Sequence, residues 1–328
     1  MSRVVLVACS PRTPPGVLTW AAWKVLHEGP VLVGDPAHVQ LAHLEAAGVT
    51  VTVAERDAGV LLERARAEGQ VVWLSSGAAD TEFVRALGDR AVRSGTDLEV
   101  VYGSYDPPGA RLLDVVSVMD RLRSPGGCPW DAEQTHSSLA PYLVEESYEL
   151  LETLEGDDRE GMREELGDVL LQVAFHARLA QEHPDAPFTI DEVAADLVDK
   201  LVRRHPHVFA GGPADDLEGS WDALKTAEKG RTSVTDGVPL GQPALALAAK
   251  LQKRAARLGV PPRAYDGLPG ELWALVTRCR AADVDPEAAL RALSRSYRDA
   301  LAAIERDVRA EGREPADQTL QEWTERWP

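Results

Sequence analysis

Hydrophobic and polar residues follow two different patterns along the chain. In the first hundred residues, short runs of β-branched and aliphatic residues alternate with segments of helical length. The runs lie at residues 4–9, 31–34, 51–55, 71–75 and 98–103. Strands that alternate with helices favour a parallel sheet. The pattern therefore predicts an α/β domain, with a parallel sheet of about five strands, over residues 1–108.

The spacing of apolar residues becomes helical after residue 108. Residues 102–109, with the sequence YGSYDPPG, concentrate turn formers, and beyond them the β-branched runs stop. Apolar residues then recur at helical spacing. The predicted helices cover residues 111–123, 136–155, 159–182, 190–204, 218–229 and 243–258, with further helices toward the C-terminus. We therefore expect an all-α domain over residues 109–242, followed by a second helical segment over residues 243–328.

Net charge and cysteine usage indicate which binding partners and which cellular compartment to expect. The chain has 35 basic and 53 acidic residues, a formal charge of −18, and no dense tract of Lys or Arg. Such a chain repels phosphodiester backbones, so DNA binding is not expected. No segment has the apolar length of a membrane span, so no membrane partner is expected either. The 3 cysteines lie far apart, which suits a reducing compartment such as the cytoplasm.

Half of the net charge lies in one short segment. Residues 145–168 contain eleven acidic and two basic residues. Glu146 and Glu149 are three residues apart, as are Glu165 and Asp168, so each pair projects from one face of its helix. The two pairs are equidistant from Asp157, at eight and eleven residues, within a Gly-Asp-Asp turn signal. In an antiparallel helical hairpin these four carboxylates are expected to converge.

Converging carboxylates require a positive partner, because burying an unpaired carboxylate costs several kcal/mol. Oxygen ligands without His or Cys suit Mg²⁺ or Mn²⁺ rather than zinc. A salt-bridged core is an equally good interpretation of this spacing, and most charge runs are solvated helix faces. The geometry alone leaves these alternatives open.

Basic and aromatic residues that could bind a nucleotide lie outside the acidic segment. Lys200, Arg203 and Arg204 share one helix face, and a second basic stripe contains Lys250, Lys253, Arg254 and Arg257. Each could equally neutralise the acidic segment or face solvent. Trp221 and Lys225 are four residues apart and could stack a base and hold a phosphate, although Trp221 could also be a core residue. Trp130 is expected in a loop, with Asp131 and Gln134 at the spacing of a capping box. His205-Pro206-His207 is interpreted as structural and is not assigned to a metal.

Together these motifs resemble the MazG-type nucleoside triphosphate pyrophosphohydrolases, a branch of the all-α NTP pyrophosphatase superfamily. The resemblance covers about residues 111–259 and rests on motifs in a fixed order. They are Arg121-Leu-Arg123, Cys128-Pro-Trp-Asp131 with Gln134-Thr135, Glu145-Glu146-x-x-Glu149, Glu165-Leu-Gly-Asp168, Lys200-x-x-Arg203-Arg204-His205-Pro206-His207-Val208-Phe209, Trp221 with Lys225, and Lys250-Leu-Gln-Lys253-Arg254-Ala255.

The resemblance implies hydrolysis of a nucleoside triphosphate to the monophosphate and pyrophosphate, with nucleotide-pool sanitation as one role for such a reaction. It also implies a homodimer. The implied ligands of Mg²⁺, for which Mn²⁺ can substitute, are Glu146, Glu149, Glu165 and Asp168. The implied nucleotide contacts are Trp130, Lys200, Arg203, Arg204, Trp221, Lys225, Lys253 and Arg254. Glu145, one residue from a ligand, is a candidate for polarising the attacking water or holding a second ion.

The two ends of the chain depart from this pattern. Residues 243–328 resemble part of a second, degenerate copy of the domain that has lost its E-x-x-D helix, so we expect it to be inactive and to serve packing or dimerisation. Residues 1–108 resemble the front half of a tetrapyrrole methylase, but no glycine-rich loop follows the first strand. We expect this domain to be non-catalytic. A Mg²⁺-nucleotide sensor without turnover and a methyltransferase are the competing functions.

Overall fold

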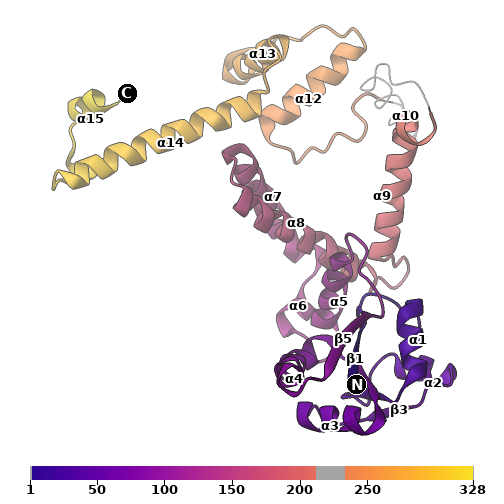
Figure 1. Ribbon diagram of the computed structural model, residues 1–328. Coiled ribbons are helices and arrows are strands. Elements are labelled where there is room, and N and C mark those ends of the chain that lie inside the picture. The colour runs from indigo at the N-terminus through magenta and orange to yellow at the C-terminus, as the bar shows by residue number, and fades with distance from the viewer. Residues whose placement is uncertain (1, 212–232, 328) are drawn as a thin grey trace. The chain divides into compact units, whose positions relative to one another are not determined.

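A computed structural model describes residues 2–211 and 233–327 of the protein. The chain divides into two compact units, Met1–Lys200 and Leu201–Pro328 (Figure 1). The helix predicted over residues 218–229 lies outside the described residues. In the described part of the chain, no helix combines the length and apolarity that a membrane crossing requires.

The first unit begins with a parallel sheet of five strands, as the sequence predicts. The strands are β1 (Arg3–Ala8), β2 (Val31–Val33), β3 (Val51–Val53), β4 (Gln70–Ser75) and β5 (Asp97–Tyr102). Their order across the sheet is β3-β2-β4-β1-β5, and every pairing is parallel. β1 and β4 lie inside the sheet and are covered on both faces, which explains their nearly continuous apolar sequences.

Helices cover both faces of this sheet. Alternate residues of a strand point to opposite faces. On one face, Leu6 of β1 and Trp73 of β4 pack with α3 (Ala58–Glu68) and α4 (Thr81–Ser94), which follows the 3₁₀ helix η1 (Gly77–Asp80). On the other face, Val7 and Leu74 pack with α1 (Trp20–Glu28) and α2 (Leu41–Ala46). The sheet domain therefore has its own complete core.

A helical region completes the first unit. It contains α5 (Arg111–Arg123), α6 (Pro129–Glu133), α7 (His136–Gly156), α8 (Arg159–Ala180) and most of α9 (Ile190–Arg204). Met119 of α5, Leu139 of α7 and Phe175 of α8 form its buried core. The half-buried Arg12 connects the sheet domain to α5, since its guanidinium pairs with Asp114 and, at 2.6 Å, with Asp106.

The second unit is helical in its described residues. It contains α10 (Pro206–Phe209), α12 (Ala244–Arg257), α13 (Gly267–Ala281), α14 (Pro286–Ala310), the 3₁₀ helix η2 (Pro315–Asp317) and α15 (Leu320–Arg326). The buried Gln252 links α12 to α13, because its amide donates to the carbonyl of Trp273 at 3.1 Å. The relation of this region to a second MazG domain stays a prediction, as do the domain limits at residues 108 and 242.

Candidate active site

A tight turn positions the two helices that carry the acidic residues. Asp157 follows α7 in the left-handed conformation, with φ 56° and ψ 29°. Asp158 then caps α8, and its carboxylate accepts hydrogen bonds from the backbone N–H groups of Glu160 and Gly161, at 3.2 and 3.0 Å. The two helices pack against each other as an antiparallel pair. The turn and the helical hairpin expected from the sequence are both present.

Three carboxylates from the two helices meet across this hairpin. Glu146 of α7 lies with Glu165 and Asp168 of α8, and one oxygen from each is within 4.8 Å of the others. All three side chains are half-buried. Within residues 2–211 and 233–327, no other group of three or more acidic, His or Cys side chains meets this condition. We refer to Glu146, Glu165 and Asp168 as the acidic trio.

The fourth expected ligand and the candidate base lie beside the trio. Glu149 is one turn along α7 from Glu146, but it is exposed and is not part of the trio. Its charge still reaches the trio, because it contributes to the raised pKa values of Glu146 and Glu165. Glu145 is exposed on the same helix. The structure therefore brings three of the four expected ligands together and leaves Glu149 and Glu145 at the edge.

The electrostatics of the trio favour a cation. Burial raises the pKa of Glu146, and repulsion from Asp168 and Glu149 raises it further. Burial also raises the pKa of Glu165, and Glu149 and Asp168 again contribute. One oxygen of Glu165, Oε2, is buried and has no hydrogen-bond partner within residues 2–211 and 233–327. Oxygen donors with an unused buried lone pair fit a hard divalent cation such as Mg²⁺ or Mn²⁺.

An aromatic pair joins α6 to the helix that carries Glu146. Trp130 is half exposed and meets the ring of Tyr142 edge-on, with 6.3 Å between centroids and 70° between planes. Tyr142 precedes Glu146 by one helical turn, so both side chains lie on one face of α7. The expectation of a loop for Trp130 was wrong, because this residue lies in the first turn of α6. The contact between Trp130 and Tyr142 was not predicted from the sequence.

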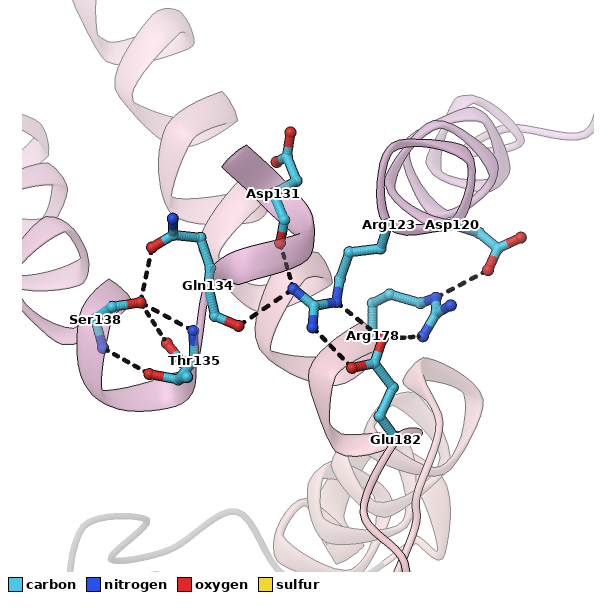
Figure 2. Close-up of polar contacts among 8 residues, drawn as sticks. All are labelled: Asp120, Arg123, Asp131, Gln134, Thr135, Ser138, Arg178 and Glu182. Carbon is cyan, nitrogen blue, oxygen red and sulfur yellow. Dashed lines mark hydrogen bonds and ion pairs between the residues drawn. The ribbon is translucent and has the colours of Figure 1, made fainter. Parts of the chain in front are cut away.

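A polar network fixes α6 and the start of α7 (Figure 2). The guanidinium of Arg123 is only 6% exposed and donates to both carboxylate oxygens of Glu182, at 2.9 and 2.7 Å. It also donates to the backbone carbonyls of Asp131 and Gln134, the latter at 3.3 Å. Arg178 donates to Glu182 and to Asp120, at 2.9 and 2.8 Å. The Arg-Leu-Arg motif therefore contributes an arginine that holds the segment carrying Trp130.

The same view shows how α7 begins. Thr135 caps the helix through a reciprocal pair of hydrogen bonds with Ser138, and Ser138 also donates to the side chain of Gln134 at 2.7 Å (Figure 2). The capping box expected from Asp131 and Gln134 was therefore wrong. Asp131 is a buried residue of α6 instead. Helix α7 starts at His136, two residues after Gln134, because Thr135 and Ser138 supply both halves of the box.

The expected nucleotide-binding cations are distributed over both units. Lys200 belongs to the first unit, is half-buried, and makes no hydrogen bond or ion pair within the described residues. Arg203, Arg204, Lys253 and Arg254 belong to the second unit. Arg204 is buried, and Arg254 donates to the carbonyls of Val234 and Asp236 at 2.9 and 2.8 Å. Trp221 and Lys225 lie outside the described residues.

The histidines after α9 contact neighbouring residues of their own segment. Pro206 starts α10, and the Nδ1 atom of His205 lies 2.7 Å from the carbonyl of Leu201. The rings of His205 and His207 meet edge-on at 5.6 Å.

Comparison with known proteins identifies the family. Residues 134–209, which contain the acidic trio, match the MazG nucleotide pyrophosphohydrolase domain. The chain is 44% identical over 233 residues to a nucleoside triphosphate pyrophosphohydrolase of Mycobacterium tuberculosis, which covers 67% of this chain and 69% of that protein. It is 36% identical over 246 residues to the nucleoside triphosphate pyrophosphohydrolase/pyrophosphatase MazG of Thermotoga maritima, covering 67% of this chain and 95% of that protein. The chain belongs to the MazG nucleotide pyrophosphohydrolase family.

A further relative comes from Streptomyces cacaoi. The chain is 56% identical over 216 residues to a 26.1 kDa protein in the blaB 3′ region, which covers 64% of this chain and 88% of that protein.

Proposed function

We propose that this protein hydrolyses nucleoside triphosphates to nucleoside monophosphates and pyrophosphate, and that the reaction takes place at the acidic trio. The supporting observation is the convergence of Glu146, Glu165 and Asp168 within 4.8 Å, inside the segment that matches the MazG domain. The relatives named as nucleoside triphosphate pyrophosphohydrolases support the same reaction class. The protein is accordingly a hydrolase of phosphoanhydride bonds.

The trio, with Glu149 as a fourth ligand, is proposed to hold Mg²⁺, for which Mn²⁺ can substitute. A divalent ion at this position supplies neutralisation of phosphate charge and a water molecule of lowered pKa. The chain contributes the fixed carboxylates, which the Asp157 turn and the packing of α7 on α8 hold in place. Glu145, exposed beside the trio, is proposed to polarise the attacking water or to hold a second ion.

The nucleoside is proposed to stack on the aromatic pair formed by Trp130 and Tyr142. The half-exposed face of Trp130 supports this, as does the position of Tyr142 one turn from Glu146. Stacking accepts every base, so it selects nucleotides without choosing one. The sequence resemblance supplies the other proposed contacts, which are Lys200, Arg203, Arg204, Trp221, Lys225, Lys253 and Arg254.

A homodimer and a role in nucleotide-pool sanitation in the cytoplasm complete the proposal. Large apolar side chains on α7 and α8 are exposed in the single chain, which supports association with a second copy. They are Tyr142, Leu143, Val144, Tyr148, Leu154, Leu166, Leu171 and Val173.

The reaction is tested by incubating the protein and Mg²⁺ with a panel of standard and damaged nucleoside triphosphates. We expect equal amounts of nucleoside monophosphate and pyrophosphate. Release of orthophosphate instead would place the attack on a different phosphoanhydride bond. Nucleotide binding without any product would make the protein a Mg²⁺-nucleotide sensor and contradict the proposed hydrolysis.

A further inference from the structure

One buried side chain next to the acidic trio has an unmet hydrogen-bonding requirement. Gln172 of α8 is only 4% exposed, and its carbonyl oxygen Oε1 has no hydrogen-bond partner among the residues that the structure describes. An unpartnered buried polar atom costs about 1–3 kcal/mol, so it calls for an explanation. Gln172 follows Asp168 by four residues and Glu165 by seven. The residue is therefore one helical turn from the nearest member of the trio.

Helix geometry directs Gln172 toward α7. At 3.6 residues per turn, its side chain lies within about 40° of Asp168 and about 20° of Glu165 around the axis of α8. Asp168 meets Glu146 of α7 on one side. On the other side, His176 meets His136 of α7, with 2.8 Å between their Nδ1 atoms and parallel rings. Gln172 is thus enclosed between two residues of α8 that both contact α7.

The groups on either side of Gln172, which are His176 and the acidic trio, indicate what donates a hydrogen bond to its Oε1. On the His176 side, the Nδ1 atom of His176 faces that of His136, and its buried Nε2 makes no hydrogen bond to Gln172. On the trio side, ionised carboxylates offer acceptors and no donor. Because the amide oxygen is sealed from bulk solvent, its partner must be small. A water molecule held within the acidic cluster satisfies these conditions, since it can donate to Gln172.

We propose that Gln172 is a positioning residue of the acidic site, and that its Oε1 accepts a hydrogen bond from a water molecule coordinated to the divalent cation held by the trio. The inference rests on the metal site of the proposed function and extends it to a residue outside the acidic motifs. The rise from Asp168 to Gln172 is about 6 Å. Mg²⁺ keeps several of its waters when it is bound, so an ion held by Asp168 would bring a coordinated water toward Gln172.

Such a contact orients a water and strengthens ion binding. Loss of a hydrogen-bond partner behind a metal site typically lowers metal affinity or activity by about 10–100-fold. An amide is suited to this position because it accepts a hydrogen bond without adding a fifth negative charge to the two acidic pairs. An apolar residue at this position would leave no hydrogen bond unmet. Binding of a coordinated water therefore explains why the residue is a glutamine.

The test measures Mn²⁺ affinity by titration calorimetry, in the absence of nucleotide, for three variants. Gln172→Met removes the acceptor and keeps the length of the side chain, whereas Gln172→Glu keeps an acceptor oxygen. The matched control is Gln318→Met, since Gln318 is also buried with an unpartnered amide but lies in the second unit. Thermal unfolding in a chelator confirms that each variant is folded, and Gln172→Leu is a second apolar replacement if Gln172→Met does not fold.

We expect the Mn²⁺ dissociation constant to rise about 10–100-fold in Gln172→Met. It should stay near the wild-type value, or fall, in Gln172→Glu, and it should not change in Gln318→Met. Unchanged Mn²⁺ affinity in Gln172→Met would overturn the inference while leaving the trio as the metal site. The amide oxygen of Gln172 would then be a buried polar atom that has no role in metal binding, as Nε2 of His176 also has no partner. A wild-type protein that takes up no Mn²⁺ would contradict both this inference and the metal site itself.

Discussion

At the scale of single residues, Arg123 holds the segment that carries Trp130, one ring of the proposed aromatic pair. Its guanidinium holds the carbonyls of Asp131 and Gln134 and the carboxylate of Glu182 together. It also lies over the ring of Phe175, 5.8 Å from the centroid. Hydrogen bonds from Arg123 hold the pKa of Glu182 below its ordinary value. A carboxylate with a depressed pKa stabilises the fold at higher pH, and this contribution is lost as the pH falls through the folded-state pKa.

Arg123→Met is therefore expected to lower the free energy of unfolding by about 1–3 kcal/mol at neutral pH, because several hydrogen bonds are lost. The difference from the wild type should shrink as the solution is acidified and Glu182 becomes protonated. Urea unfolding at a series of pH values measures both effects. The control is Arg121→Met, the same substitution at an exposed residue two positions earlier. Equal losses in both variants, or a difference that does not depend on pH, would contradict the assigned role of Arg123.

Single residues also show which side-chain positions the spacing of a motif cannot predict. Spacing placed Glu146, Glu165 and Asp168 on facing surfaces of two helices, and these three meet. It placed Glu149 there as well, but that side chain is exposed and lies outside the trio. Spacing fixes the helix face and the height of a residue, whereas the rotamer decides where the carboxylate goes. The burial of Gln172 likewise depends on tertiary packing and could not be predicted from its position alone.

At the scale of elements, α7 and α8 carry large apolar side chains that are exposed within the described residues of the first unit. Val144 is 55% exposed and Tyr148 is 47% exposed, one turn apart on α7. Leu166 of α8 is also exposed. Monomeric proteins rarely leave large apolar patches in contact with water. The proposed homodimer would bury these side chains.

We expect the wild-type protein to have the mass of a dimer in light-scattering measurements. Val144→Glu should raise the dissociation constant of that dimer by at least about tenfold, or about 1.4 kcal/mol, because it introduces a charge into an apolar contact. Val92→Glu is the control, since Val92 is exposed on α4 of the sheet domain. A monomeric wild type, or equal effects of the two substitutions, would contradict dimerisation through α7 and α8.

Long elements were easier to predict than short ones. The helices predicted over residues 111–123 and 190–204 match α5 and α9 at both ends. Helix α6 was missed because 5 residues are too few to show a hydrophobic period. The contact between Trp130 and Tyr142 was missed for a related reason, because it joins two elements whose relative placement depends on Arg123.

At the scale of the whole molecule, the sequence predicted the order of architectures along the chain. The change from β-branched runs to helical periodicity near residue 108 corresponds to the passage from β5 to α5. The strand order β3-β2-β4-β1-β5 could not be predicted, because β4 pairs with both β1 and β2 through contacts distant in sequence. The positions of the second unit's basic residues in the proposed site likewise rest on resemblance alone.

The central claim is that the acidic trio performs Mg²⁺-dependent release of pyrophosphate from nucleoside triphosphates. The most direct measurement compares initial rates of pyrophosphate release for wild type, Glu165→Gln and Glu164→Gln. The two variants change the charge equally at adjacent residues, but Glu164 is exposed and lies outside the trio. We expect Glu165→Gln to reduce the rate by at least about 100-fold, in line with removal of a group that acts in the transition state. Glu164→Gln should stay within about twofold of the wild type, as expected for an exposed position. Equal rates for the two variants would contradict the claim.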